Sequence, residues 1–306
     1  MKSRQLKAHM AILLANVIFG FGIPVTKILL DEWVTPLGYM FTRCAGAAAI
    51  FWVISWFMPK EKIRARDLLI IVLGGLMGVV VSQTLTAWAL VYTTPVYFSL
   101  IAVLTPVSTM ILAALFIGER ITRQKMGAVL TGIAGALLLV VAGWQSGSGK
   151  NDLLGILLAI LSLLTWSEYL IITRSVSNKY TAVTQMKWIF LVSSIALLPF
   201  ALSELDEQRL YSRAWGMDGV LEMLFIVVFA TVSGYFAIPY AMKYLRATTV
   251  SIYTNLQPIV ASFIAIAIGQ DRFSWDKPVA LLLVLLSAYL ITCREEKTES
   301  KTKEGS

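Results

Sequence analysis

Long uncharged stretches alternate along the chain with short polar segments. The longest covers residues 68–118, where 51 consecutive positions hold no charged side chain. As a single helix rising about 1.5 Å per residue, it would exceed a hydrocarbon core of about 30 Å more than twofold. Proline and the residue before it disfavour a continuing helix, so we expect the chain to turn back near Tyr92–Pro95. This stretch therefore predicts two membrane-spanning helices.

The same pattern, followed along the whole chain, predicts ten membrane-spanning helices. The apolar runs are uniform and do not alternate with polar positions, which favours helices over a transmembrane β-barrel. The predicted fold class is an all-α integral membrane protein. The ten spans lie near residues 9–27, 36–58, 68–88, 95–117, 126–143, 153–173, 183–203, 220–241, 248–269 and 278–293.

Composition agrees with this fold class. The chain of 306 residues is 58% hydrophobic and 14% charged, whereas soluble proteins are about 45–50% apolar and about 25% charged. Its two cysteines, Cys44 and Cys293, form neither a disulfide framework nor a metal-binding cluster, and both suit the role of small apolar fillers. We therefore predict no metal site and no cofactor.

The charges predict the orientation in the membrane. The net charge is +8, from 26 Lys and Arg against 18 Asp and Glu. If the N-terminus is cytoplasmic, 18 basic residues fall in cytoplasmic segments, five fall in outer loops, and Lys27, Arg43 and Lys187 fall inside spans. This positive-inside bias predicts a multi-pass protein of the plasma or inner membrane with both termini in the cytoplasm. Nucleic acid is not a predicted partner, because the basic residues are spread over short loops on one side.

The chain also contains an internal repeat. Pro106 precedes Glu119-Arg120 by thirteen residues, and Pro258 precedes Asp271-Arg272 by the same spacing, 152 residues later. The predicted units are residues 9–143 and 153–293, joined by a linker at 144–152 and followed by a charged cytoplasmic tail at 294–306. Because each unit has five spans, the second enters the membrane from the opposite side. Two inverted repeats of this kind suit alternating access to a central site.

Several of these features together resemble a known family. They are Phe19-Gly20 with Lys27 in the first span, Arg43 in the second, the segment Gly118–Thr122 after the fourth, and a glycine-rich fifth span. Over about residues 9–293 the chain is similar to the EamA branch of the drug/metabolite transporter superfamily. The resemblance implies outward transport of small metabolites such as amino acids and related solutes. Phe19 stands where the family often has tryptophan, and Glu168 is not a general family feature.

The matched fourth and ninth spans predict matched cavity faces. Pro106 and Pro258 leave the carbonyl groups of Ala102 and Thr254 without their usual helical donors. Either a solute or a water molecule donates to these groups, or they lie at a helix kink that is packed within the protein. Other polar residues at membrane depth either face the cavity or bond a neighbouring helix. The candidate substrate-binding residues are Asn16, Gln83, Tyr97, Thr105, Trp166, Tyr235, Tyr253, Asn255 and Gln257.

Three charged residues inside the spans carry open alternatives. Glu168 is the only acidic residue deep in a span, and it could couple transport to protons, pair with Lys187, or reach the inner membrane surface. Arg43 and Lys27 lie in the outer half of their spans. They could bind an anionic group of a substrate, or instead reach the interface and helix-end carbonyl groups.

Other classes of membrane protein lack support in the sequence. An intramembrane enzyme acting on lipid or peptide would need a nucleophile and a base, but His9 is the only histidine and no HExxH or GxSxG motif occurs. An uncoupled channel would need a filter-like segment, which we do not find. A nucleotide-driven pump would need a Walker-type glycine loop, and the sequence contains none. We therefore predict a secondary transporter, with protons as a candidate coupling ion and a small molecule as its partner.

Overall fold

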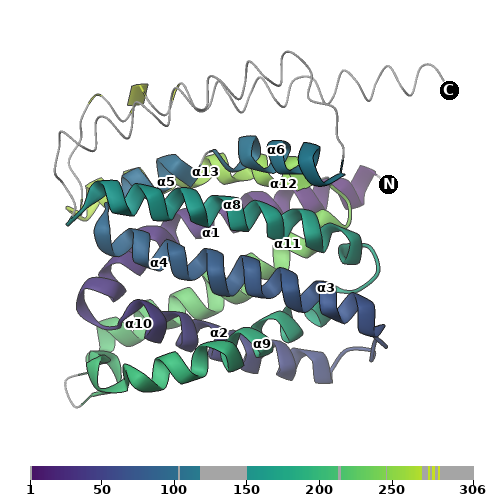
Figure 1. Cartoon of the computed structure of the whole chain (residues 1–306), viewed down its shortest axis with the longest axis horizontal. Helices are drawn as coiled ribbons and strands as arrows, with labels where there is room; N and C mark the ends of the chain where they lie inside the picture. Colours follow the sequence, from purple (N-terminus) through teal and green to yellow (C-terminus); the bar gives the residue numbers. More distant parts are fainter. Residues whose placement is uncertain are drawn as a thin grey trace.

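In the computed structural model, helices are the only regular secondary structure among the described residues. Its helices lie side by side along one long axis (Figure 1). The predicted fifth and tenth spans, the linker up to residue 149 and the charged tail fall almost entirely outside the described residues. The structure describes residues 2–102, 104–117, 150–212, 215–245, 247–270, 275, 278–279 and 282.

Seven helical stretches are long and apolar enough to cross a membrane, which makes the chain a multi-pass membrane protein. They correspond to the first four and the sixth to eighth predicted spans. The predicted ninth span is described as three short elements and is not among the seven, so the count of ten helices stays a prediction. The seven stretches are Arg4–Glu32, Pro36–Trp56, Ala65–Tyr92, Pro95–Phe116, Asp152–Ser177, Ala182–Ser203 and Met217–Met242.

Four unbroken helices form much of the bundle. They are α1 (Lys2–Glu32), α2 (Pro36–Trp56), α8 (Asp152–Ser177) and α9 (Ala182–Ser203). Threonine caps both α2 and α9, at Thr35 and Thr181, where each side chain accepts a hydrogen bond from a backbone N–H of the first turn. After α9 come two short 3₁₀ helices, η2 (Leu205–Glu207) and η3 (Arg209–Tyr211).

Two further spans contain a π-helical middle. The first is α3 (Ala65–Gly75), η1 (Leu76–Val81) and α4 (Ser82–Tyr92). The second is α10 (Met217–Phe225), η4 (Ile226–Ser233) and α11 (Gly234–Met242). Residues 76–81 shifted by the repeat distance of 152 fall on 228–233, inside η4. π-Helical turns are rare and often occur at functional sites, so their recurrence at this offset makes both segments candidates for parts of a functional site.

The next span of each half is interrupted at the matching place. α4 ends at Tyr92 and α5 (Pro95–Ala102) begins at the proline, as predicted. α6 (Thr105–Ile117) follows after a short break. In the second half, α12 (Ala247–Ile252), η5 (Tyr253–Asn255) and α13 (Leu256–Ala267) repeat this interruption. The carbonyl group freed by Pro106 has an internal donor, because the Thr105 hydroxyl donates to Ala102 O at 2.5 Å.

Elements from the two halves of the chain pack against each other. α2 packs along α9, α4 along α8, and α1 along both α11 and α13. In Figure 1, α3 lies to the right of α4, whereas α10 lies to the left of α11; likewise α5 lies to the left of α6, whereas α12 lies to the right of α13. Along the long axis, the chain runs from α3 to α4 and from α10 to α11 in opposite directions, and likewise from α5 to α6 and from α12 to α13.

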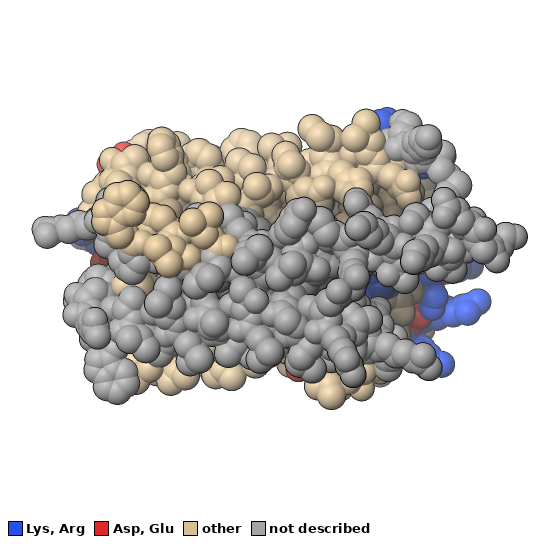
Figure 2. Space-filling model, turned by 90° about the horizontal axis from the view of Figure 1, so that it is seen from above, with Lys and Arg blue, Asp and Glu red and all other residues tan. Residues whose placement is uncertain are grey.

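Charged side chains gather at the ends of the helices. In Figure 2 the described residues along the middle are tan, and blue Lys and Arg atoms cluster at the right-hand end. Exposed basic residues in loops or at helix ends of the described chain include Lys60, Lys62, Lys179 and Lys243. The uncharged middle is what a hydrocarbon core requires.

Candidate functional site

A cavity of about 120 Å³ lies among the middle parts of the helices. Its volume is similar to that of a cavity of about 150 Å³ that admits benzene in another protein. Residues of both halves line it, and the lining combines aromatic and aliphatic groups with hydroxyl, amide and guanidinium groups. The polar and aromatic lining residues are Asn16, Phe19, Thr26, Tyr39, Arg43, Ser82, Gln83, Thr86, Phe98, Thr105, Ser162, Trp166, Tyr235, Ser251, Thr254 and Gln257.

Arg43 of α2 is the charged residue of this lining. Its side chain is 6% exposed. Nε donates to Thr231 Oγ1 at 2.7 Å, and Nη1 donates to Gln83 Oε1 at 3.1 Å. The guanidinium carbon lies 5.2 Å from the ring centre of Tyr235 and 5.9 Å from that of Tyr39. Two hydrogen bonds and two aromatic faces thus hold a cation at membrane depth.

The π-helical turns of η4 position Thr231. Its hydroxyl donates to the carbonyl of Ile226, five residues earlier, at 2.8 Å. Since a threonine hydroxyl has one hydrogen, that bond leaves only its lone pairs for Arg43. The wider π-helical turn thus fixes the hydroxyl oxygen of Thr231 as a hydrogen-bond acceptor beside the guanidinium group of Arg43. On the other side, Gln83 is the second residue of α4, two positions after the π-helical turns of η1 end at Val81.

Aromatic side chains surround Tyr235, which is 1% exposed. Phe19 and Trp166 each meet its ring edge-to-face, with ring centres 5.7 Å away. Phe190 contacts it at 5.4 Å. Edge-to-face pairs of this kind fix ring positions and leave a rigid apolar wall beside the guanidinium.

Hydrogen bonds also join the two halves across the lining. Gln257 Nε2 of α13 donates to Asn16 Oδ1 of α1 at 2.7 Å, and Asn16 Nδ2 donates to Ile12 O at 2.8 Å. The hydroxyls of Ser162 and Thr86 lie 2.7 Å apart. These bonds satisfy polar groups that would be costly at membrane depth.

Six of the nine candidate substrate-binding residues meet at this cavity. They are Asn16, Gln83, Thr105, Trp166, Tyr235 and Gln257. Their side chains come from six different helical segments, and their convergence is a property of the fold.

The structure puts two other candidates elsewhere. Tyr97 is 2% exposed within an apolar cluster formed by residues of α1, α4, α5, α8 and α13. Tyr97 lies in α5 and Thr105 begins α6, so a break after Ala102 separates the two candidates. Tyr253 lies in η5, and its hydroxyl is 2.7 Å from His9 Nδ1 near the start of α1. The side chain of Asn255 lies outside the described residues.

The sequence left alternatives open for three charged residues, Glu168, Lys27 and Lys187. The structure shows the surroundings of each. Glu168 is absent from the cavity lining. It shares a face of α8 with Leu161, Leu164 and Ile172, all exposed. The described residues contain no ion pair between Glu168 and Lys187; Lys187 Nζ lies 5.1 Å from the Trp52 ring centre. Lys27 donates to the carbonyl of Leu90 at 2.6 Å and pairs with Asp31 at 3.2 Å.

The sequence analysis did not identify Thr231, and it did not place Arg43 at the centre of the site. Thr231 gives no signal in the sequence, because a π-helical segment shifts the phase of a regular helix. Arg43 does give one: it lies in a predicted span without an acidic residue at comparable depth in that span. In the part of the chain that the structure describes, no group of His, Cys, Asp and Glu could hold a metal ion.

Comparison with known proteins places the chain among transporters. Relatives include an uncharacterized transporter of Archaeoglobus fulgidus, 24% identical over 92% of this chain and 97% of the relative, and the uncharacterized transporter YyaM of Bacillus subtilis, 26% identical over 92% of each chain. A protein of Streptantibioticus cattleyicolor named a probable terminal-alkyne amino-acid exporter is 26% identical over 63% of each chain.

A solved crystal structure has the same fold, with a TM-score of 0.67 over 98% of this chain and 99% of that chain, at 18% identity. The family and the names of the relatives point to a transporter and not to an enzyme. The model of the EamA-like transporter family matches residues 6–141 and 153–293, so the chain belongs to the EamA-like transporter family.

Proposed function

We propose that this protein is a secondary transporter that exports a small metabolite, such as an amino acid or a related solute, by alternating access around the central cavity. The observation that carries the proposal is the cavity itself, which is lined by polar and aromatic residues of both halves at the middle of the bundle. Binding sites at the interface of two repeats are typical of such transporters.

The proposed repeats are inverted, comprising residues 9–143 and 153–293. Matching π-helical segments and matching breaks at the 152-residue offset support this arrangement. The opposite directions of corresponding elements in Figure 1 support it as well. Two similar halves of opposite orientation can exchange conformations, which would open the cavity first to one side and then to the other.

The proposed location is the plasma membrane, with both termini in the cytoplasm. The gathering of basic side chains at one end of the molecule supports this orientation (Figure 2). The name of the Streptantibioticus relative, an exporter of an amino acid, supports outward transport of an amino acid or related solute.

Glu168 is the proposed coupling group for protons. Because it lies off the cavity lining, its protonation would act through the packing of α8 and not through contact with the solute. Glu168→Gln removes the titrating group at nearly constant shape. We expect this variant to lose pH-driven uptake while keeping exchange of solute across the membrane. An unchanged response to a pH gradient would contradict the coupling role.

The proposed function is tested by reconstitution into lipid vesicles. Vesicles containing the purified protein should exchange labelled L-leucine, L-methionine or L-phenylalanine for unlabelled solute on the other side faster than empty vesicles do. Exchange requires no assumption about the coupling ion. Rates equal to those of empty vesicles for every amino acid and amine in a broad panel would contradict the proposal.

A further inference from the structure

Arg43 is a buried cation that has no acidic partner among the residues that the structure describes. In the described part of the chain the ion pairs are Lys27–Asp31 and Lys179–Asp67, and neither involves Arg43. The predicted spans at 126–143 and 278–293, outside the described residues, contain no Asp or Glu in their sequence. An unpaired charge at membrane depth is costly, and such residues commonly mark a binding site.

The neighbours of Arg43 leave part of its hydrogen-bonding capacity directed at the cavity. A guanidinium has five N–H donors. The bonds to Thr231 and Gln83 use two of them, and the hydroxyl groups of Tyr39 and Tyr235 also lie within reach of the group. Gln83 must offer its oxygen, because arginine cannot accept a hydrogen bond. The amide NH₂ of Gln83 is therefore turned away from Arg43, and Gln83 also lines the cavity. Donors of both side chains border the same space.

From this arrangement we infer that Arg43 binds the carboxylate of the transported solute, with the Gln83 amide as a second donor. The inference rests on the proposed transport function and adds the chemical class of the solute. A guanidinium forms two parallel hydrogen bonds to a carboxylate, which an ammonium group cannot reproduce. Thr231 acts as a positioning residue, since its bond to Nε fixes the plane of the fork.

The remainder of the solute is small and apolar. Trp166, Phe19 and Tyr235 form a rigid wall beside the guanidinium, and the cavity of about 120 Å³ limits the size of the guest. Aliphatic, thioether and aromatic amino acids combine such a group with a carboxylate. The carboxylate would also neutralise Arg43, so bound solute removes the cost of the buried charge.

Binding of matched pairs of compounds tests this inference. L-leucine, L-methionine and L-phenylalanine are compared with their amides, which lack the carboxylate but keep the amino group and side chain. Thermal unfolding of the purified wild-type protein is measured with each compound. We expect the acids to raise the melting temperature and the amides to leave it unchanged, because only a ligand of the folded state stabilises it.

Two variants at the site sharpen the test. Gln83→Glu has the same shape and supplies an internal carboxylate to Arg43, so it should fold well and lower the affinity for the acids at least about tenfold. Arg43→Gln removes the cation and should abolish the preference for acids over amides. Gln5→Glu makes the same chemical change as Gln83→Glu at an exposed residue of α1 and should bind the acids normally.

The outcomes separate this inference from the proposed function. Amides that stabilise or cross the membrane as well as the acids would contradict the carboxylate site, and so would unchanged binding in Gln83→Glu. The inference would also be overturned if none of the acids stabilised the protein more than its amide did. A protein that binds the acids but exchanges none of them in vesicles would contradict the transport function alone.

Discussion

The two ends of the α2–α9 helix pair use the same capping arrangement with different side chains. At one end Thr35 caps α2, and its hydroxyl donates to the carboxylate of Glu204, which follows α9. At the other end Thr181 caps α9, and its hydroxyl donates to the carboxylate of Glu61, which follows α2, at 3.0 Å. Each helix start is therefore tied to the segment that follows its partner in the other half.

The backbone N–H of each cap residue is satisfied in a similar way. Thr35 N donates to Gln208 Oε1 at 3.1 Å, and Thr181 N donates to Glu61 Oε2 at 3.0 Å. In an ordinary capping box a Glu or Gln three residues after the cap would accept this bond. Gly38 and Thr184 occupy those positions, and a Cβ at Gly38 would collide with the Gln208 side chain. The other half of the chain supplies the missing acceptor at both ends.

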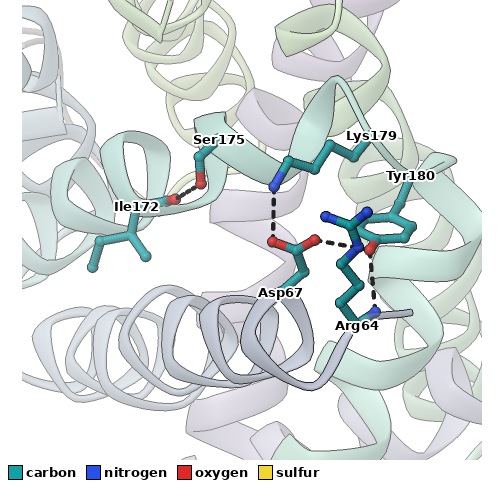
Figure 3. Close-up of polar contacts among 6 residues, drawn as sticks. All are labelled: Arg64, Asp67, Ile172, Ser175, Lys179 and Tyr180. Atoms are coloured by element: carbon teal, nitrogen blue, oxygen red, sulfur yellow. Dashed lines mark hydrogen bonds and ion pairs between the residues drawn. The ribbon is translucent and has the colours of Figure 1, made fainter.

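The two ends differ in charge. The end at Thr35 is completed by Gln208, a neutral side chain that is 1% exposed and also donates to Thr35 Oγ1 at 2.6 Å. The end at Thr181 adds an ionic contact, in which Lys179 Nζ donates to Asp67 Oδ1 at 2.8 Å and the Tyr180 hydroxyl donates to Asp67 Oδ2 at 2.9 Å (Figure 3). Under the proposed alternating access, each end would release in turn, and the Lys179–Asp67 contact makes the end at Thr181 sensitive to ionic strength.

The largest effect on this comparison is expected from Gln208→Ala. The substitution removes three hydrogen bonds of a buried side chain, to Thr35 N, Thr35 Oγ1 and Glu204 O. We expect a loss of about 1–3 kcal/mol in unfolding free energy, since buried groups are left without partners. Thermal unfolding of the purified protein measures the loss, with the exposed Gln5→Ala as control. A loss below about 0.5 kcal/mol, the range of ordinary surface substitutions, would show that Gln208 contributes little to the end at Thr35.

Removal of the two caps should have a smaller effect and allows the ends to be compared directly. Thr35→Val and Thr181→Val keep the shape of the side chain and remove its hydroxyl. Each should lower the unfolding free energy by about 1 kcal/mol, a typical cost of losing an N-cap. Thr35→Val should cost more, because its hydroxyl also accepts from Gln208. A greater loss in Thr181→Val, measured in the same way, would reverse the predicted order.

The sequence predicts the elements of this molecule better than the faces they present. The turn at Tyr92–Pro95 and the spacing between the halves follow from local rules for proline and from direct correspondence of residues. Such rules do not state which neighbour a residue meets. Gln208 and Glu61 are remote in sequence from the threonines whose N–H groups they accept, so no local pattern reveals the shared caps.

The candidate site shows the same limit. Arg43 and Glu168 both lie inside predicted spans, yet Arg43 borders the cavity and Glu168 shares a face with exposed leucines. The depth of a residue in the membrane can be counted along its helix. The direction of its side chain around the helix axis can be predicted only where the periodicity is unbroken and the neighbours are known. The breaks before Thr105 and at η5 and the π-helical turns of η4 interrupt that periodicity, which explains why the sequence does not reveal the position of Tyr97 away from the cavity or the role of Thr231.

The smallest effect is expected from Asp67→Asn, and its dependence on salt makes it the sharpest test of the difference between the ends. The amide oxygen can still accept from Tyr180, so the variant loses chiefly the charge that faces Lys179, whose side chain is half exposed. Exposed and half-exposed ion pairs contribute little and are screened by salt. The melting temperature of Asp67→Asn should fall slightly below that of the wild type in dilute buffer and equal it in concentrated sodium chloride. The loss caused by Gln208→Ala should stay constant across the same series, because neutral hydrogen bonds are not screened. Equal salt dependence of the two variants would mean that charge does not distinguish the ends.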